Sequence, residues 1–214
     1  MARPEKLKGW PLLAASSPAQ SIPFSSVIRD LHATLQAGGV TYAIIGGVAV
    51  ARAGSSRTTG DIDLLLRREE WAGVLEAPLQ RGAHRRFELA NDGATHKPSG
   101  VSIDILFAGD DWDLPFLLPD PGDVREWDRA AEAWFIKPAR LLELKAAIYL
   151  SKMNEYGASV AAKDLYDVSA LIAARPELRN TAQIEQFHPS IQETVRKTVV
   201  EIERREERGP KRPK

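Results

Sequence analysis

Two aspartates separated by one residue, Asp61 and Asp63, belong to the segment Asp-Ile-Asp-Leu-Leu-Leu. In a strand, successive side chains point to opposite faces, so both carboxylates would project together while Ile62 and Leu64 turn toward the core. Neighbouring carboxylates repel each other unless a cation neutralises them. Hard oxygen ligands of this kind suit Mg²⁺ or Mn²⁺, which also retain water and substrate phosphate as ligands. The pair therefore predicts a divalent-metal site that handles phosphate.

Two glycines, Gly46 and Gly47, follow the apolar, strand-like run 40–45 and precede a short helical segment, 48–53. Because glycine has no Cβ, the backbone there can approach a phosphate closely. The amides at the start of the following helix add hydrogen-bond donors and the positive end of the helix dipole. We therefore expect Gly46 and Gly47 to bind the triphosphate of a nucleotide.

The loop 54–60 connects this helix to the aspartates and contains Arg57 and Thr58. A guanidinium in this loop could bind phosphate oxygens in bidentate fashion, and the threonine could donate its hydroxyl. A solvated turn is the alternative interpretation of the same residues. Arg57 and Thr58 are thus further candidates for nucleotide binding.

A third carboxylate, Asp104, lies inside the strand-like segment 101–107. Alternation places Asp104 on the face opposite to Ile103 and Ile105. A carboxylate within an otherwise apolar strand is uncommon, which favours a functional role over an ordinary exposed aspartate. Asp104 is therefore the third candidate ligand for a metal ion.

In the second half of the chain, Lys145 has Leu141 and Ile148 within one helical turn, so its ammonium rises from an apolar stripe. Such a lysine predicts a phosphate or carboxylate partner. The alternative is a lysine at the edge of the stripe that extends its charge into solvent.

A second helical segment holds Lys163, Asp164 and Asp167. For Lys163 and Asp167, an exposed ion pair four residues apart is the alternative to a functional role.

The glycine pair, thirteen intervening residues and the Asp-x-Asp motif resemble the signature of the polymerase-β-like nucleotidyltransferase superfamily. The segments 138–147 and 163–172 further resemble AbiEii-type nucleotidyltransferases, the toxins of type IV toxin–antitoxin systems. The resemblance covers residues 40–172 and implies that the lysines and aspartates of the two helical segments face the metal site. It gives catalytic candidates Asp61, Asp63, Asp104, Lys145 and Asp164, and nucleotide-binding candidates Gly46, Gly47, Arg57, Thr58, Lys145, Lys163 and Asp167.

This resemblance implies transfer of an NMP from an NTP to an acceptor hydroxyl, with Mg²⁺ (or Mn²⁺) held by Asp61, Asp63 and Asp104. It also implies that the acceptor is RNA, tRNA in particular, and that a cognate antitoxin is a partner. Beyond residue 172 the chain offers a brief charged helix in place of an RNA-binding domain, so a protein or a small molecule is an alternative acceptor. A non-catalytic nucleotide-binding or antitoxin-like module is the remaining alternative.

Composition sets the outer limits of these expectations. The 214 residues correspond to one domain, or to one domain with a small appendage. Because 29 basic residues balance 29 acidic ones, the chain has no overall basic field for non-specific binding of nucleic acid. The absence of cysteine excludes disulfides, thiolate metal sites and a cysteine nucleophile. No apolar run is long enough for a signal peptide or a membrane span, which favours a cytoplasmic protein without membrane partners.

Periodicity and turn residues predict an α+β fold, with a small mixed sheet of nucleotidyltransferase type flanked by helices and a helical C-terminal portion. We expect an irregular lead-in at 1–23, the nucleotidyltransferase core at 24–136, the helical portion at 137–208 and a tail at 209–214. Apolar spacing predicts a helix from residue 27, with Ser25 or Ser26 as its cap, that stops at Gly38. The segment 109–132, with eight carboxylates and two arginines, is expected to be a solvated loop.

Overall fold

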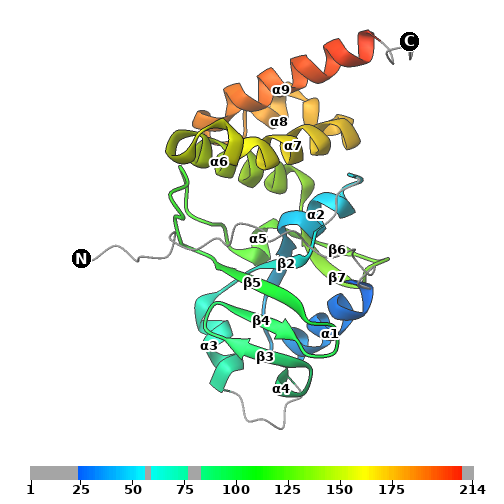
Figure 1. Ribbon diagram of the computed structural model, residues 1–214, viewed down its shortest axis with the longest axis vertical. Helices are drawn as coiled ribbons and strands as arrows, with labels where there is room; N and C mark the ends of the chain where they lie inside the picture. Colours follow the sequence, from blue (N-terminus) through cyan, green and yellow to red (C-terminus); the bar gives the residue numbers. More distant parts are fainter. Residues whose placement is uncertain (1–23, 56–58, 77–82, 209–214) are drawn as a thin grey trace, which may run out of the picture.

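The computed structural model describes residues 24–55, 59–76 and 83–208, and it divides into a sheet half and a helical half (Figure 1). The strands form one mixed sheet in the order β3-β4-β5-β2-β1-β7-β6. They are β1 (Tyr42–Ile45), β2 (Asp61–Leu66), β3 (Phe87–Ala90), β4 (Gly93–His96), β5 (Val101–Phe107), β6 (Arg125–Asp128) and β7 (Ala133–Ile136). The helices are α1 (Phe24–Ala37), α2 (Gly46–Arg52), α3 (Arg68–Glu76), α4 (Ala83–Arg86), α5 (Pro121–Val124), α6 (Pro138–Tyr156), α7 (Ala158–Ala174), α8 (Thr181–Ile184) and α9 (Pro189–Glu207), with a 3-10 turn, η2 (Pro176–Arg179). The expected α+β fold is confirmed.

The centre of the sheet is built from its most apolar strands. β2 pairs antiparallel with β1 and parallel with β5. Ile62, Leu64 and Leu66 of β2 are fully buried, as expected for strands covered on one face by helices. Because β2 and β5 run in parallel and in register, residues at matching positions on the two strands project side by side.

Helix α1 shows the expected apolar stripe, since Val27, Ile28, Leu31 and Leu35 are all buried. The helix starts at Phe24, so the prediction that Ser25 or Ser26 caps it is wrong: both serines lie inside the first turn. Gly39, with φ +70°, follows its C-terminal end, and glycine adopts that left-handed conformation without steric cost.

The helical half is built on α6 and α7, which pack extensively on each other, with α9 against both. Pro138 opens α6, where its fixed φ suits the first turn. Gly157, with φ +83°, is the single residue between α6 and α7. A connection this short brings the facing sides of the two helices into contact. None of the described helices is long and apolar enough to cross a membrane.

Two strands, β4 and β6, were not predicted from the sequence. β4 lies in the glycine-, asparagine- and proline-containing segment 91–100 between β3 and β5, and it pairs with both of them. The prediction of a solvated loop over 109–132 is wrong in part, because it contains α5 and β6. β6 forms an edge of the sheet and pairs only with β7, so its charged residues remain compatible with a strand.

Candidate functional site

The three predicted aspartates lie on two adjacent central strands. Asp61 and Asp63 are on β2, and Asp104 is directly opposite Asp63 on β5. Asp61 and Asp63 are half-buried, whereas Asp104 is the most accessible of the three. The parallel pairing therefore gathers three carboxylates on one face of the sheet, as the alternation of each strand predicted.

The glycines pack directly against the central aspartate. The Gly47 N–H donates to Asp63 Oδ2 over 3.3 Å. Gly46 has φ +63°, and a Cβ at this position would lie 1.8 Å from Asp63 Oδ2. Since such an overlap involves the side chain of the site itself, Gly46 is required both for its backbone conformation and for the space that it leaves to Asp63.

The carboxylates perturb one another strongly. Burial, with the neighbouring charges of Asp61 and Asp104, raises the pKa of Asp63 to about 6, against the opposing effects of Lys145 and the Gly47 N–H. Partial burial and then the charge of Asp61 also raise the pKa of Asp104. A divalent cation would relieve this repulsion, so the donor set fits a hard metal ion.

Hydroxyl groups fix the orientation of two of the carboxylates. Thr59 donates from Oγ1 to Asp61 Oδ1 over 2.6 Å, and Ser102 donates to Asp104 Oδ1 over 3.4 Å. Within the described ranges, no group of three carboxylate or imidazole side chains is already drawn together as a closed metal cluster. The three aspartates therefore lie on neighbouring positions of the two paired strands. Their carboxylate oxygens would have to move closer together to bind one cation.

The helical half contributes a buried ionic cluster. The Lys145 ammonium is 2.9 Å from Asp167 Oδ2 and 3.4 Å from Asp164 Oδ1. The side chain of Asp167 is fully buried and that of Asp164 is 3% exposed. The alternative of an exposed Lys163–Asp167 surface pair is therefore wrong for Asp167, and Lys145 has the carboxylate partners that its apolar surroundings predicted. Lys145 also lies close enough to Asp63 to lower its pKa, so it links the helical cluster to the sheet.

Lys152, which the sequence analysis did not single out, belongs to the same cluster. Its ammonium is 2.7 Å from Asp164 Oδ2. Lys152 follows Lys145 by seven residues on α6, which places both on one face of the helix. That spacing was the available signal, but it is common on ordinary helices.

Three predicted nucleotide-binding residues remain to be placed: Lys163, Arg57 and Thr58. Lys163 lies exposed on α7, three residues before Tyr166. Arg57 and Thr58 lie outside the residues that the structure describes. Arg52, at the C-terminal end of α2, pairs with Asp128 of the edge strand β6.

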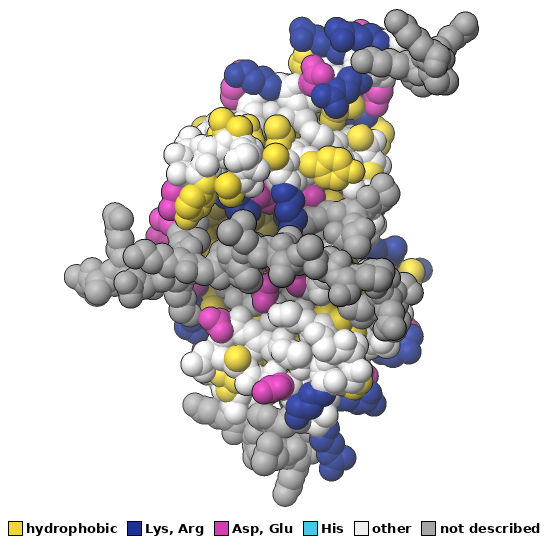
Figure 2. Space-filling view, viewed as in Figure 1, with side chains coloured by type: hydrophobic (Ala, Val, Ile, Leu, Met, Phe, Trp, Pro, Cys, Tyr) yellow, Lys and Arg dark blue, Asp and Glu magenta, His cyan; other side chains and the backbone are white. Residues whose placement is uncertain are grey.

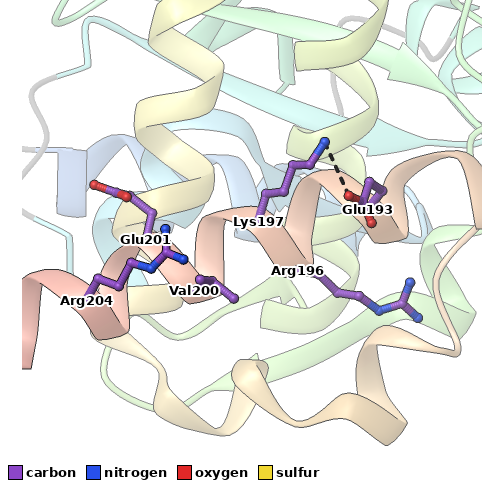
Figure 3. A pocket seen from close by; sticks show the side chains of 6 residues that line it. All are labelled: Glu193, Arg196, Lys197, Val200, Glu201 and Arg204. Carbon is purple, nitrogen blue, oxygen red and sulfur yellow. Dashed lines mark ion pairs between the residues drawn. The ribbon is translucent and has the colours of Figure 1, made fainter.

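The surface between the two halves carries charged side chains of both signs (Figure 2). Figure 2 shows acidic side chains at the upper border of the sheet half and basic ones at the lower border of the helical half. A separate groove of about 430 Å³ lies along α9, between Arg196, Lys197 and Arg204 (Figure 3). Every residue that lines it comes from this one helix, so it is an open surface groove remote in sequence from the aspartates.

Comparisons with solved structures support the fold. The chain is similar to an antigenic nucleotidyltransferase-like protein from Paracoccidioides brasiliensis, with TM-score 0.57, 20% identity, and coverage of 86% of this chain and 90% of that one. It is also similar to ANT(2'')-Ia in complex with adenylyl-2''-tobramycin, with TM-score 0.50, 12% identity, and coverage of 81% and 97%. No protein-family model matches the chain, and no curated protein matches it significantly. The chain has the nucleotidyltransferase-like fold. The more specific AbiEii-type assignment stays a prediction.

Proposed function

We propose that the protein is a Mg²⁺-dependent (or Mn²⁺-dependent) nucleotidyltransferase that moves an NMP from an NTP to an acceptor hydroxyl. One observation carries this proposal: Asp61, Asp63 and Asp104 lie side by side on parallel strands, against the Gly46–Gly47 start of α2. The charge of the buried Lys145 also lowers the pKa of Asp63. Such an arrangement joins a metal-binding carboxylate set to a backbone segment that admits phosphate closely.

In this proposal Asp61, Asp63 and Asp104 hold the metal ions, which would supply alignment and charge stabilisation for displacement at the α-phosphate. Asp104, the most accessible carboxylate with a raised pKa, accepts the proton of the acceptor hydroxyl. The acceptor oxygen forms a bond to the α-phosphorus, the bond from that phosphorus to the bridging oxygen breaks, and pyrophosphate leaves.

In this proposal the candidate glycines, Arg57, Thr58 and the two lysines bind the triphosphate. Gly46 and Gly47 let the backbone approach it, and Arg57 and Thr58 would contact its oxygens from the loop. Lys145 and Lys163 neutralise its charge. Asp164 and Asp167 are too buried to reach a substrate, so their role is to hold Lys145.

For the acceptor, the resemblance to AbiEii-type enzymes supports RNA, tRNA in particular, and a cognate antitoxin as partner. A second candidate comes from the structural similarity to ANT(2'')-Ia, whose structure contains adenylyl-2''-tobramycin. A small hydroxylated amine is therefore the competing acceptor class, and a protein hydroxyl is the third.

The test is incubation of the purified protein with each α-³²P-labelled NTP and Mg²⁺, in parallel with total RNA, with tobramycin and with cell protein. The variant Asp61→Asn/Asp63→Asn should abolish transfer, while Asp123→Asn, an exposed aspartate on α5, should leave it unchanged. Label on one acceptor class identifies the substrate. Absence of label on every acceptor, or label that persists in the double variant, would refute the proposed reaction.

A further inference from the structure

Two lysines of α6 share one carboxylate of α7. The Lys152 ammonium lies 2.7 Å from Asp164 Oδ2, and the Lys145 ammonium lies 3.4 Å from Asp164 Oδ1. Lys145 makes its closer contact with Asp167, at 2.9 Å. Asp164 is therefore held mainly by Lys152, and Lys145 mainly by Asp167.

The cluster is largely shielded from solvent. The side chains of Lys145, Asp164 and Asp167 are 9%, 3% and 0% exposed, and that of Lys152 is 23% exposed. Buried charges are costly unless they are paired, so the buried Asp164 carboxylate needs a cation in close contact. Without Lys152, Asp164 would attract the ammonium of Lys145, which contacts Asp167 more closely.

The charge of Lys145 also acts on the sheet half of the protein. This charge lowers the pKa of Asp63 in the sheet, where the proposed function places the metal ions and the triphosphate. An ammonium drawn further toward Asp164 would be drawn away from that position, because the attraction between unit charges rises steeply at short distance.

We propose that Lys152 is a positioning residue: by neutralising Asp164, it keeps Lys145 on Asp167 and directed toward the nucleotide. This inference rests on the proposed function for its effect on catalysis, since Lys152 acts through Lys145 and need not touch the substrate. Its geometric part concerns only the four charged groups of α6 and α7.

The kinetic test compares Lys152→Met, Lys152→Arg and the double variant Lys152→Met/Asp164→Asn. Lys152→Met should lower kcat/KM for the NTP by about tenfold, largely through KM. Lys152→Arg, which keeps the charge, should restore most of the loss. The double variant removes a neutral pair, so it should also recover toward the wild type. Lys197→Met is the matched control, since Lys197 is a 76% exposed lysine paired with Glu193 on α9.

The structural test does not depend on activity. In a crystal structure of Lys152→Met, the Lys145–Asp164 distance should shorten from 3.4 Å to about 2.8 Å, the length of a charge-assisted hydrogen bond. If Lys152→Met fails to fold, a double variant that folds and is active gives the same support, because it isolates the uncompensated charge as the cause.

The outcomes separate the two proposals. An inactive wild type refutes the proposed function, and the crystal structure still decides the arrangement of Lys145. An active wild type with unchanged Lys152→Met kinetics and an unmoved Lys145 overturns the positioning role. A double variant as impaired as Lys152→Met overturns it too, because charge balance would then not be what Lys152 provides.

Discussion

At the scale of single residues, the glycine beside Asp63 makes the sharpest prediction. Gly46→Ala should lower the free energy of unfolding by several kcal/mol and abolish transfer, because the new Cβ displaces the Asp63 carboxylate. Gly39→Ala is the matched control: its φ of +70° is equally left-handed, but nothing lies within 4 Å of the added Cβ. It should therefore cost only the backbone strain, about 1 kcal/mol. Denaturant unfolding measures the stability of both variants. Equal losses of unfolding free energy in Gly46→Ala and Gly39→Ala would contradict a clash with Asp63.

The raised pKa of Asp63 predicts a pH-dependent penalty on stability. Between about pH 4, its ordinary pKa, and about pH 6, its folded value, the folded protein binds more protons at this carboxyl than the unfolded chain does. Stability must then fall as the pH rises through this window. Asp63→Asn removes the penalty, so in EDTA at pH 7.5 it should be more stable than the wild type, by up to about 3 kcal/mol.

Urea unfolding at pH 4 and pH 7.5 gives this difference directly. The advantage of Asp63→Asn should shrink toward zero at pH 4, and Asp123→Asn should show no such trend. An asparagine variant that is less stable than the wild type at pH 7.5 would rule out a buried, mutually repelled carboxylate.

The sequence alone predicts the placement of the three aspartates, but it does not identify the partners of Lys145. Alternation on 61–66 and 101–107 placed the three aspartates on the correct faces, because a strand has a fixed two-residue period. The apolar neighbours of Lys145 predicted an anionic partner. They could not identify Asp164 and Asp167, since that pairing depends on how α6 and α7 face each other.

At the scale of elements, Arg67 ties the end of β2 to the segment that follows β5. Its guanidinium contacts both oxygens of Asp120, at 2.6 and 2.9 Å, and also Glu70 at 2.6 Å. Arg67→Lys retains the charge but loses the bidentate geometry, so it should lower the free energy of unfolding by about 1 kcal/mol. Arg86→Lys is the control, because Arg86 is 58% exposed and contacts Asp30 through one nitrogen at 2.9 Å, so it should change stability by less than about 0.5 kcal/mol. Equal losses of stability in the two lysine variants, measured by thermal unfolding, would contradict a stabilising role for the bidentate Arg67–Asp120 contact.

Arg67 also explains why the acidic segment 109–132 was misjudged. Counted locally, its carboxylates far outnumber its arginines, a pattern typical of a solvated loop. In the fold, Asp110, Asp120 and Asp128 pair with Arg68, Arg67 and Arg52, which come from the preceding elements. Local composition cannot include partners that only the tertiary structure supplies. β4 was missed for a related reason, since its Gly-Ala-Thr-His sequence has little strand preference and pairs because β3 and β5 flank it.

At the scale of the whole molecule, metal binding should stabilise the protein as well as activate it. Under the proposed function, Mg²⁺ would relieve the repulsion among three carboxylates that the pairing of β2 and β5 brings together, so it would bind the folded state preferentially. The melting temperature of the wild type should rise with Mg²⁺ concentration in calorimetry. Asp61→Asn/Asp63→Asn should show no rise, and an equal rise in that variant would place the metal elsewhere.

The single-residue connection at Gly157 also bears on the order of folding. The Lys152–Asp164 contact spans 12 residues, whereas about 40 residues of chain separate Asp63 from Asp104. Contacts between near neighbours in sequence form faster than long-range strand pairing, since less chain entropy is lost in closing them. In pulse-labelled hydrogen exchange during refolding, the amides of α6 and α7 should therefore gain protection before those of β2 and β5. Lys145 and Lys152 would then reach their folded positions before Asp63 and Asp104 come together on the paired strands.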